Sequence, residues 1–296
     1  MIDSQEVPQA KETLALSEIN SLRLKLKMDE EFRKEFFNDE DFRKAVAPYT
    51  EVLDWGTESV IVVDPQDEKK VIGIGYHDRG FNTGIMPFTE TRFLHEIINT
   101  LFPKNFPKVY KIENMGARDT LRERVFGETA TWSGSDANIY DRVENKLQYL
   151  GIRVISDPFS RNYMKNTDGH IKYVDLLQGA ESIKQIDVEK TKQFFMSTHG
   201  ISAKNIDSDR SWKTLSYQIR KLKELILANK IFSDMSASGK YDLNDKRVQD
   251  QIEGFHFTKD QDENSRSKND IRRLLTRAIK AVNEEGHVFK DHKWVK

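Results

Sequence analysis

Residues 156–177 read SDPFSRNYMKNTDGHIKYVDLL and place three oxygen-bearing side chains at fixed intervals. Asp157 comes first, Asn162 follows it by five residues, and Asp175 follows Asn162 by thirteen. The runs IRVIS (152–156) and HIKYVDLL (170–177) are short and apolar, which is typical of strands. The stretch therefore predicts two carboxylates and one amide oxygen converging around a strand and its loops.

These three side chains suit a site for a metal ion and a phosphate. Carboxylate and amide oxygens are the hard ligands that magnesium prefers, and magnesium is usually shared with substrate phosphates. Phosphoryl transfer also needs a carboxylate that accepts the proton of the attacking hydroxyl. We expect Asp157 to be that base, and Asn162 and Asp175 to hold the metal. The competing interpretation is that all three are ordinary polar groups of loops flanking a strand.

The segment on the N-terminal side predicts a β-meander, a helix and a second pair of strands. EVLDWGTESVIVVD (51–64) indicates a strand, a turn and a second strand, and VIGIGYHD (71–78) indicates a third strand. TETRFLHEIINTLF (89–102) has its apolar residues on one helical face. FPKVYKIENMGARDTLRERVFGE (106–128) indicates two strands joined by an Asn-Met-Gly turn.

The two ends of the chain predict helices. Residues 10–47 have the periodicity of a helical pair, broken near FNDED, where Asn38 or Asp39 can cap the second helix. Residues 135–150 predict another helix, and nearly everything beyond residue 185 has helical periodicity. The polar segment 256–268 is expected to be a loop.

Over about residues 49–200 the chain resembles the protein-kinase-like superfamily. Among the atypical members of that superfamily, it resembles the Rio-type kinases and the aminoglycoside phosphotransferases. The family pattern has a catalytic-loop Asp, an Asn five residues later and a metal-binding Asp about thirteen residues beyond, which Asp157, Asn162 and Asp175 match. The resemblance implies an α+β, two-lobed fold. The lobes are a β-meander with a helix (49–127) and a mostly helical C-terminal lobe (128–296), preceded by a helical extension (1–48).

The resemblance also implies nucleotide-binding positions. EVLDWGTESVIVVD resembles the phosphate loop and its strands, with Gly56 in the turn. Trp55 at the tip either caps the nucleotide or packs beneath the loop. Glu96 occupies the ion-pairing position of the family's helix C, although a solvated helix residue is the simpler interpretation. TLRERVFGET resembles the hinge strand whose backbone binds adenine, here at Arg124, Val125 and Phe126.

The sequence departs from the family pattern at three places. Gly56 is the only one of the three expected loop glycines, with Asp54 and Ser59 in the other places. Gly73 and Gly75 stand where the third strand should carry a lysine, and the nearby candidates to replace that lysine are Lys70, His77 and Arg79. Asp175 is followed by LLQ and no Ala-Pro-Glu anchor appears, so a long activation segment is not expected.

Composition narrows the functional classes. The 296 residues include 47 Lys and Arg and 48 Asp and Glu. Because these charges nearly cancel, we expect no extended positive electrostatic potential of the kind that binds nucleic acid. The absence of cysteine excludes thiolate metal sites and cysteine nucleophiles. No apolar run approaches the roughly 18 residues that a membrane span needs, and a cytoplasmic protein is expected.

The predicted function is an atypical phosphotransferase that uses ATP and Mg²⁺ and acts on a hydroxyl of a protein or small molecule not identified by the sequence. Two alternatives remain open. A pseudokinase would bind a partner without catalysis, as the missing lysine and glycines suggest. A nucleotidyl transferase would keep the site but move a nucleotide monophosphate to protein, which the mass of the product distinguishes.

Overall fold

The structure is a computed structural model that describes residues 6–55, 59–75, 87–110, 120–129, 135–152, 163–174, 186–285, 288–290 and 293–295. The chain forms two compact units. The first contains Met1–Arg79 and Pro107–Gly127, and the second contains Gly80–Phe106 and Glu128–Lys296. Helices and small antiparallel sheets make up both units, which confirms the predicted α+β class.

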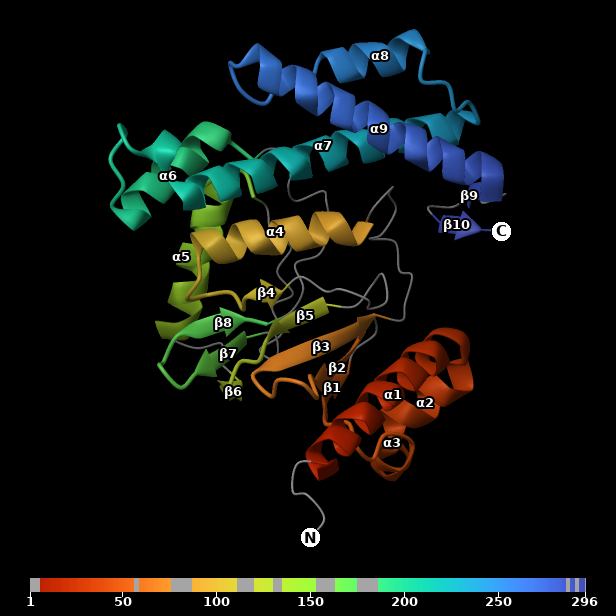
Figure 1. Cartoon of the computed structure of the whole chain (residues 1–296). Helices are drawn as coiled ribbons and strands as arrows, with labels where there is room; N and C mark the ends of the chain where they lie inside the picture. The colour runs from red at the N-terminus through yellow and green to blue at the C-terminus, as the bar shows by residue number, and fades with distance from the viewer. Residues whose placement is uncertain are drawn as a thin grey trace. The chain divides into compact units, whose positions relative to one another are not determined.

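The first unit contains a five-stranded antiparallel sheet in the order β1-β2-β3-β5-β4 (Figure 1). Its strands are β1 (Val52–Trp55), β2 (Ser59–Val63), β3 (Lys70–Gly75), β4 (Val109–Tyr110) and β5 (Thr120–Glu123). The first three strands form the predicted meander, and helix α4 (Pro87–Leu101) precedes β4 in the chain. Strand β5 returns to pair with β3, with Leu121 opposite Ile72. The predicted order of three strands, a helix and two strands is confirmed.

The N-terminal segment forms three helices, not the predicted pair: α1 (Glu6–Met28), α2 (Glu30–Asn38) and α3 (Glu40–Val46). The additional break lies at Asp29, whose carboxylate accepts a hydrogen bond from the Phe32 backbone N–H at 2.9 Å and so caps α2. Asp39 caps α3 in the same way, through the Phe42 N–H at 3.0 Å. Capping at Asp39 was one of the two predicted possibilities.

One face of the sheet is covered by these helices. Val60 and Val62 of β2 and Ile72 and Ile74 of β3 are buried against side chains of α1 and α2, among them Ile19, Leu22, Leu26 and Phe36. Because side chains alternate along a strand, Gly73 and Gly75 lie on the opposite face, paired with Ile61 and Ser59. The helical extension is therefore part of the hydrophobic core of the first unit.

The second unit is mostly helical and is organised around a long helix, α7 (Arg210–Ser238). Helices α4 and α9 (Gln261–Glu285) pack against it along much of its length, as Figure 1 shows. The other helices that the structure describes in this unit are α5 (Ser135–Tyr149), α6 (Val188–His199), the 3₁₀ helix η3 (Ile206–Ser208) and α8 (Lys246–Glu253). Helix α4, which the resemblance groups with residues 49–127, belongs to this unit.

Short strands complete the fold. A three-stranded sheet is formed by β6 (Gly127–Thr129), β7 (Tyr163–Asn166) and β8 (Ile171–Tyr173), and β9 (Val288–Lys290) pairs with β10 (Lys293–Val295). Strand β8 lies within the predicted strand 170–177, whereas β7 and the β9–β10 pair were not predicted. Most of the predicted strand 152–156 lies outside the described residues. Among the described residues, none of the helices combines the length and the apolar character that a membrane-spanning segment needs.

The prediction that residues 256–268 form a loop is wrong for its second half, because α9 begins at Gln261. The side chain of Asn264 is buried, and its Oδ1 accepts a hydrogen bond from the Phe257 N–H at 2.8 Å. Its Nδ2 donates to the Thr258 carbonyl, also at 2.8 Å. In the sequence, Asn264 looks like a polar loop residue. In the structure, its side chain forms hydrogen bonds with the backbone that precedes α9 and so fixes the start of the helix.

Candidate functional site

The β7–β8 hairpin is the described element closest in sequence to the predicted metal site. Tyr163 pairs with Tyr173 at its open end, and Lys165 pairs with Ile171 near the turn. Both tyrosines are buried, and their ring centroids lie 5.1 Å apart. The register of the hairpin is therefore fixed by a buried cross-strand aromatic pair.

The turn and one neighbouring loop hold this hairpin in place. In the turn, the Asn166 side-chain oxygen accepts a hydrogen bond from the His170 N–H at 2.8 Å, and Gly169 takes a left-handed conformation with φ of 77°. From the loop after α4, the Asn105 carbonyl accepts a hydrogen bond from the Tyr173 N–H at 2.8 Å. Asn105 Nδ2 donates to the Ile171 carbonyl at 3.3 Å. Hydrogen bonds thus hold the turn of the hairpin from within and attach strand β8 to Asn105.

The predicted base and metal ligands, Asp157, Asn162 and Asp175, lie outside the described residues, as does Gly56. In sequence, Asn162 directly precedes Tyr163, and Asp175 follows Tyr173 by two residues. In the sequence, the hairpin therefore lies between these two predicted ligands, and its paired residues Tyr163 and Tyr173 are the ones nearest to them. Among the residues that the structure does describe, no group of three or more His, Asp or Glu side chains is arranged to hold a metal ion.

Trp55 is packed toward the N-terminal helices. It pairs with Val60, whose side chain faces those helices, and it contacts the core of the first unit. The Arg43 guanidinium lies 3.9 Å from the centroid of the Trp55 ring. The same guanidinium donates to the carbonyls of Phe36 and Phe37, at 2.7 and 3.1 Å, at the end of α2. This placement fits the interpretation that Trp55 packs beneath the turn better than the interpretation that it caps a nucleotide.

Replacement of Arg43 tests this contact. Arg43→Ala removes two charge-assisted hydrogen bonds and one cation–π contact, so the free energy of unfolding should fall by about 1–3 kcal/mol. Arg43→Lys should recover only part of the loss, because an ammonium cannot both reach two carbonyls and stack on the ring. Denaturant unfolding followed by tryptophan fluorescence measures the change.

Lys44→Ala is the matched control. Lys44 pairs with Glu40 on the surface, with about 70% of each side chain exposed, and its loss should change stability by less than about 0.5 kcal/mol. Equal effects of the two alanine variants would show that the Arg43 contacts contribute nothing measurable.

The predicted hinge follows β5. The Arg124 N–H donates to the Lys69 carbonyl at 2.8 Å, and its guanidinium forms an ion pair with Glu51 at 2.8 Å. The Arg124 backbone donor is therefore already used within the first unit. Apart from bonds within helices and strands, the backbone groups of Val125 and Phe126 make no backbone hydrogen bond to the described residues. The side chain of Phe126 is exposed. Of the three predicted hinge positions, these two have backbone groups with no such partner among the described residues, and backbone groups of this kind bind a base edge.

Glu96 lies in the middle of α4 and is half-buried. Its Oε2 accepts a hydrogen bond from Nε2 of Gln218 in α7 at 2.8 Å. The interpretation of Glu96 as a solvated helix residue is therefore wrong, because the carboxylate links two packed helices of the second unit.

Lys70, one of the cations considered as a replacement for the strand lysine, is held elsewhere. It begins β3, about 16 Å along the strand from Gly75, which pairs with Ser59 beside the β1–β2 turn. Its Nζ lies 3.0 Å from the Asp67 carboxylate, and this hydrogen bond raises the pKa of Lys70 above its ordinary value. Lys70 thus cannot serve at the centre of the strand. His77 and Arg79 lie outside the described residues.

Sequence reasoning missed Arg43, although a repeated pattern could have indicated it. DEEFRK (29–34) and DEDFRK (39–44) recur ten residues apart. In each copy the Asp caps a new helix, and the Arg donates to the end of the preceding helix: Arg33 to the Leu26 carbonyl at 2.6 Å, and Arg43 to that of Phe36. Sequence reasoning also missed Lys223 of α7. Burial lowers the pKa of the Lys223 ammonium, and the nearby Asp187 carboxylate opposes that effect.

No protein-family model matches the chain, and a search of curated proteins finds no match either.

Proposed function

We propose that this protein is an atypical phosphotransferase of kinase-like architecture that transfers phosphate from ATP, with Mg²⁺, to a hydroxyl acceptor. The register of the β7–β8 hairpin is the observation that carries the proposal. Tyr163 pairs with Tyr173, and in the sequence Asn162 comes one residue before Tyr163 and Asp175 two residues after Tyr173. Two residues far apart in a catalytic stretch would thereby become neighbours.

The donor set fits magnesium. Asn162 and Asp175 supply an amide oxygen and a carboxylate, which are hard ligands, and a magnesium ion usually completes its shell with water and substrate phosphates. When bound, the ion neutralises negative charge on the phosphates. Asp157, five residues before Asn162, would accept the proton of the acceptor hydroxyl. No cysteine or zinc-type ligand set is needed for this chemistry.

Two features of the first unit support nucleotide binding. The sheet face opposite the N-terminal helices carries Gly73 and Gly75, which have no side chains to keep a ligand away from the backbone. Val125 and Phe126 follow β5 after Arg124, and among the described residues their backbone groups have no partner outside helices and strands, so they would be open to an adenine edge. The order of three strands, a helix and two strands is common to this chain and to the family it resembles.

Thermal unfolding tests the proposal, with ATP present or absent and magnesium present or absent, followed by mass spectrometry of the same samples. A ligand at a hundred times its Kd adds about 2.7 kcal/mol, a readily visible shift. We expect a magnesium-dependent shift and the mass of one phosphate on an acceptor. The added mass of a nucleotide monophosphate would identify nucleotidyl transfer. No shift with any nucleotide would overturn the proposal.

One observation favours a second candidate, a pseudokinase that binds a partner without catalysis. Strand β3 carries Val71, Ile72, Gly73, Ile74 and Gly75 where the family has its lysine, and Lys70 is held by Asp67 at the other end of the strand. A shift with ATP that needs no magnesium, without added mass on the protein or on any lysate component, would favour this candidate.

A further inference from the structure

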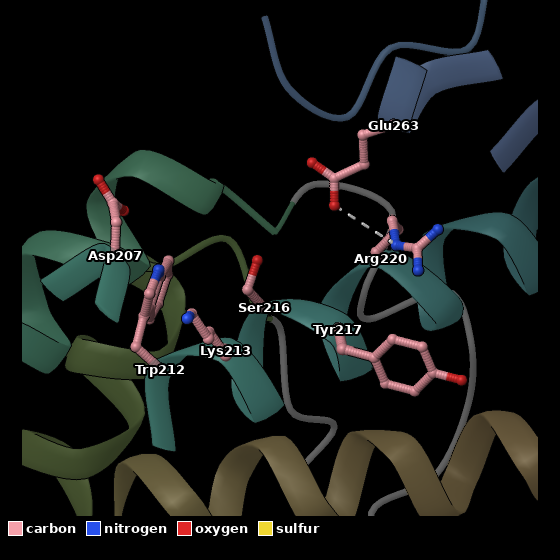
Figure 2. Close-up of a pocket in the computed structure, with 7 residues that line it drawn as sticks. All are labelled: Asp207, Trp212, Lys213, Ser216, Tyr217, Arg220 and Glu263. Carbon is pink, nitrogen blue, oxygen red and sulfur yellow. Dashed lines mark ion pairs between the residues drawn. The ribbon is translucent and has the colours of Figure 1, made fainter. Parts of the chain in front are cut away.

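A pocket of about 240 Å³ lies along the first half of α7 in the second unit (Figure 2). Its lining comes from α7, from η3 at Asp207 and from the first turn of α9 at Glu263. The α7 side chains recur three or four residues apart, at Lys213, Ser216 and Arg220, so they form one stripe on the helix. The pocket shares no residue with the proposed phosphotransfer site.

Two donors of this stripe have no partner among the described residues. Within the described part of the chain, neither Lys213 Nζ nor Ser216 Oγ has a hydrogen bond or ion pair. They stand three residues apart, which places them about 4.5 Å apart along the helix axis, close enough for both to reach one small group. The pocket therefore presents a cation and a hydroxyl that are free for a ligand.

Arg220 is the third donor, and its orientation is already fixed. Its NH1 donates to the carboxylate of Glu224, a residue with 0% exposure, at 3.3 Å and lies 3.5 Å from Ser267 Oγ. Its Nε is buried and makes no hydrogen bond to the described residues. The NH1 end of the guanidinium is thus anchored, and the buried Nε is aimed at Glu263 on the wall of the pocket, so it is preorganised for an acceptor that takes the place of this carboxylate.

The acidic side chains of the lining are held by partners. Asp207 pairs with Lys192 at 2.7 Å. Glu263 accepts a hydrogen bond from Thr258 Oγ1 at 3.1 Å and reaches toward Arg220, where its oxygen lies 3.7 Å from Nε, too far for a hydrogen bond (Figure 2). An incoming anion can take the place of Glu263 beside Arg220.

We infer that this pocket binds a small oxyanion, the phosphate or carboxylate group of a compact molecule, between Lys213, Ser216 and Arg220. The exposed ring of Tyr217 and the buried ring of Trp212 form apolar walls for the body that carries the charged group. Lys213 supplies the charge, Ser216 a hydrogen bond and Arg220 a fixed N–H. Glu263 acts as a competitor that the ligand displaces.

The test is a thermal-unfolding titration of the full chain with phosphoserine, inorganic phosphate and aspartate, each at constant ionic strength. Phosphoserine or aspartate should raise Tm to saturation. Lys213→Met should weaken the affinity at least about tenfold, as the loss of one hydrogen bond to a charged group predicts. Glu263→Gln should strengthen it about threefold, because the competing charge is removed and the side chain keeps its shape.

Lys230→Met is the matched control: Lys230 is an exposed lysine of the same helix, outside the pocket, and its loss should leave the affinity unchanged. Asp175→Asn should also leave it unchanged, which separates this site from the proposed phosphotransfer site. A shift with phosphoserine and inorganic phosphate but not aspartate would identify phosphate as the bound group, and equal shifts would identify any oxyanion. No saturable shift, or equal loss in the Lys213 and Lys230 variants, would overturn the inference.

Discussion

Asp175→Asn is expected to abolish the magnesium-dependent stabilisation of this protein by ATP. The substitution removes a ligand charge with almost no change in volume, so the fold and its Tm without ligand should be retained. At a hundred times the Kd, the parent protein should gain about 2.7 kcal/mol from magnesium and ATP, and the variant should gain none of the part that depends on magnesium. Thermal unfolding with and without the metal measures both.

Asp157→Asn provides the contrast for this prediction. A base that accepts the acceptor proton contributes about 10²–10⁴-fold to the rate, so phosphate transfer should fall by that factor while binding of magnesium and ATP persists. The two variants thus separate metal binding from proton transfer. Equal stabilisation of parent and Asp175→Asn by magnesium and ATP would remove Asp175 from the site.

Phe36→Ala should be the most destabilising single change in the N-terminal helices. Phe36 is fully buried, stacks on Phe32 with ring centroids 5.9 Å apart, and packs against the sheet core. Truncating a buried phenylalanine typically costs about 3–5 kcal/mol, because apolar contacts are lost and a cavity remains. Denaturant unfolding of the full chain measures the loss.

Leu24→Ala is the control within the same helical extension. Leu24 is 65% exposed, so its truncation should change the free energy of unfolding by no more than about 0.5 kcal/mol. If Phe36→Ala were no more destabilising than Leu24→Ala, the helical extension would not be part of the core of the first unit.

Local signals predicted much of the fold. The meander was predictable because short apolar runs rich in β-branched residues, VIVV (60–63) and VIGI (71–74), are separated by the polar turn PQDEKK (65–70). Helices α3 and α7 have capping carboxylates, Asp39 and Asp209, directly before their first turns. Each of these features is decided by residues close together in the sequence.

The orientation of Trp55 could not be predicted in this way. The register of β1 shifts between Val52 and Asp54, a bulge that places Trp55 opposite Val60 and on the face of the N-terminal helices. A single extra residue exchanges the two faces of a strand, and the sequence pattern alone does not show where it falls. The stacking of Arg43 on that ring then depends on tertiary contacts.

Polar residues with tertiary roles were the second source of error. Asn264 reads as a loop residue but is buried and satisfies the backbone before α9. Glu96 reads as a surface residue but accepts a hydrogen bond from Gln218, more than a hundred residues away in the chain. The pocket donors Lys213 and Arg220 belong to a helix that was predicted, but their grouping with Glu263 depends on how α9 packs on α7.

The most direct test of the central claim is a crystal structure of the protein with a non-hydrolysable ATP analogue and Mn²⁺, which replaces magnesium and is located by its anomalous scattering. We predict a metal ion coordinated by side-chain oxygens of Asn162 and Asp175 and by phosphate oxygens of the nucleotide, with the Asp157 carboxylate facing the γ-phosphate. A metal ion and nucleotide bound by other residues would contradict the proposed phosphotransferase site.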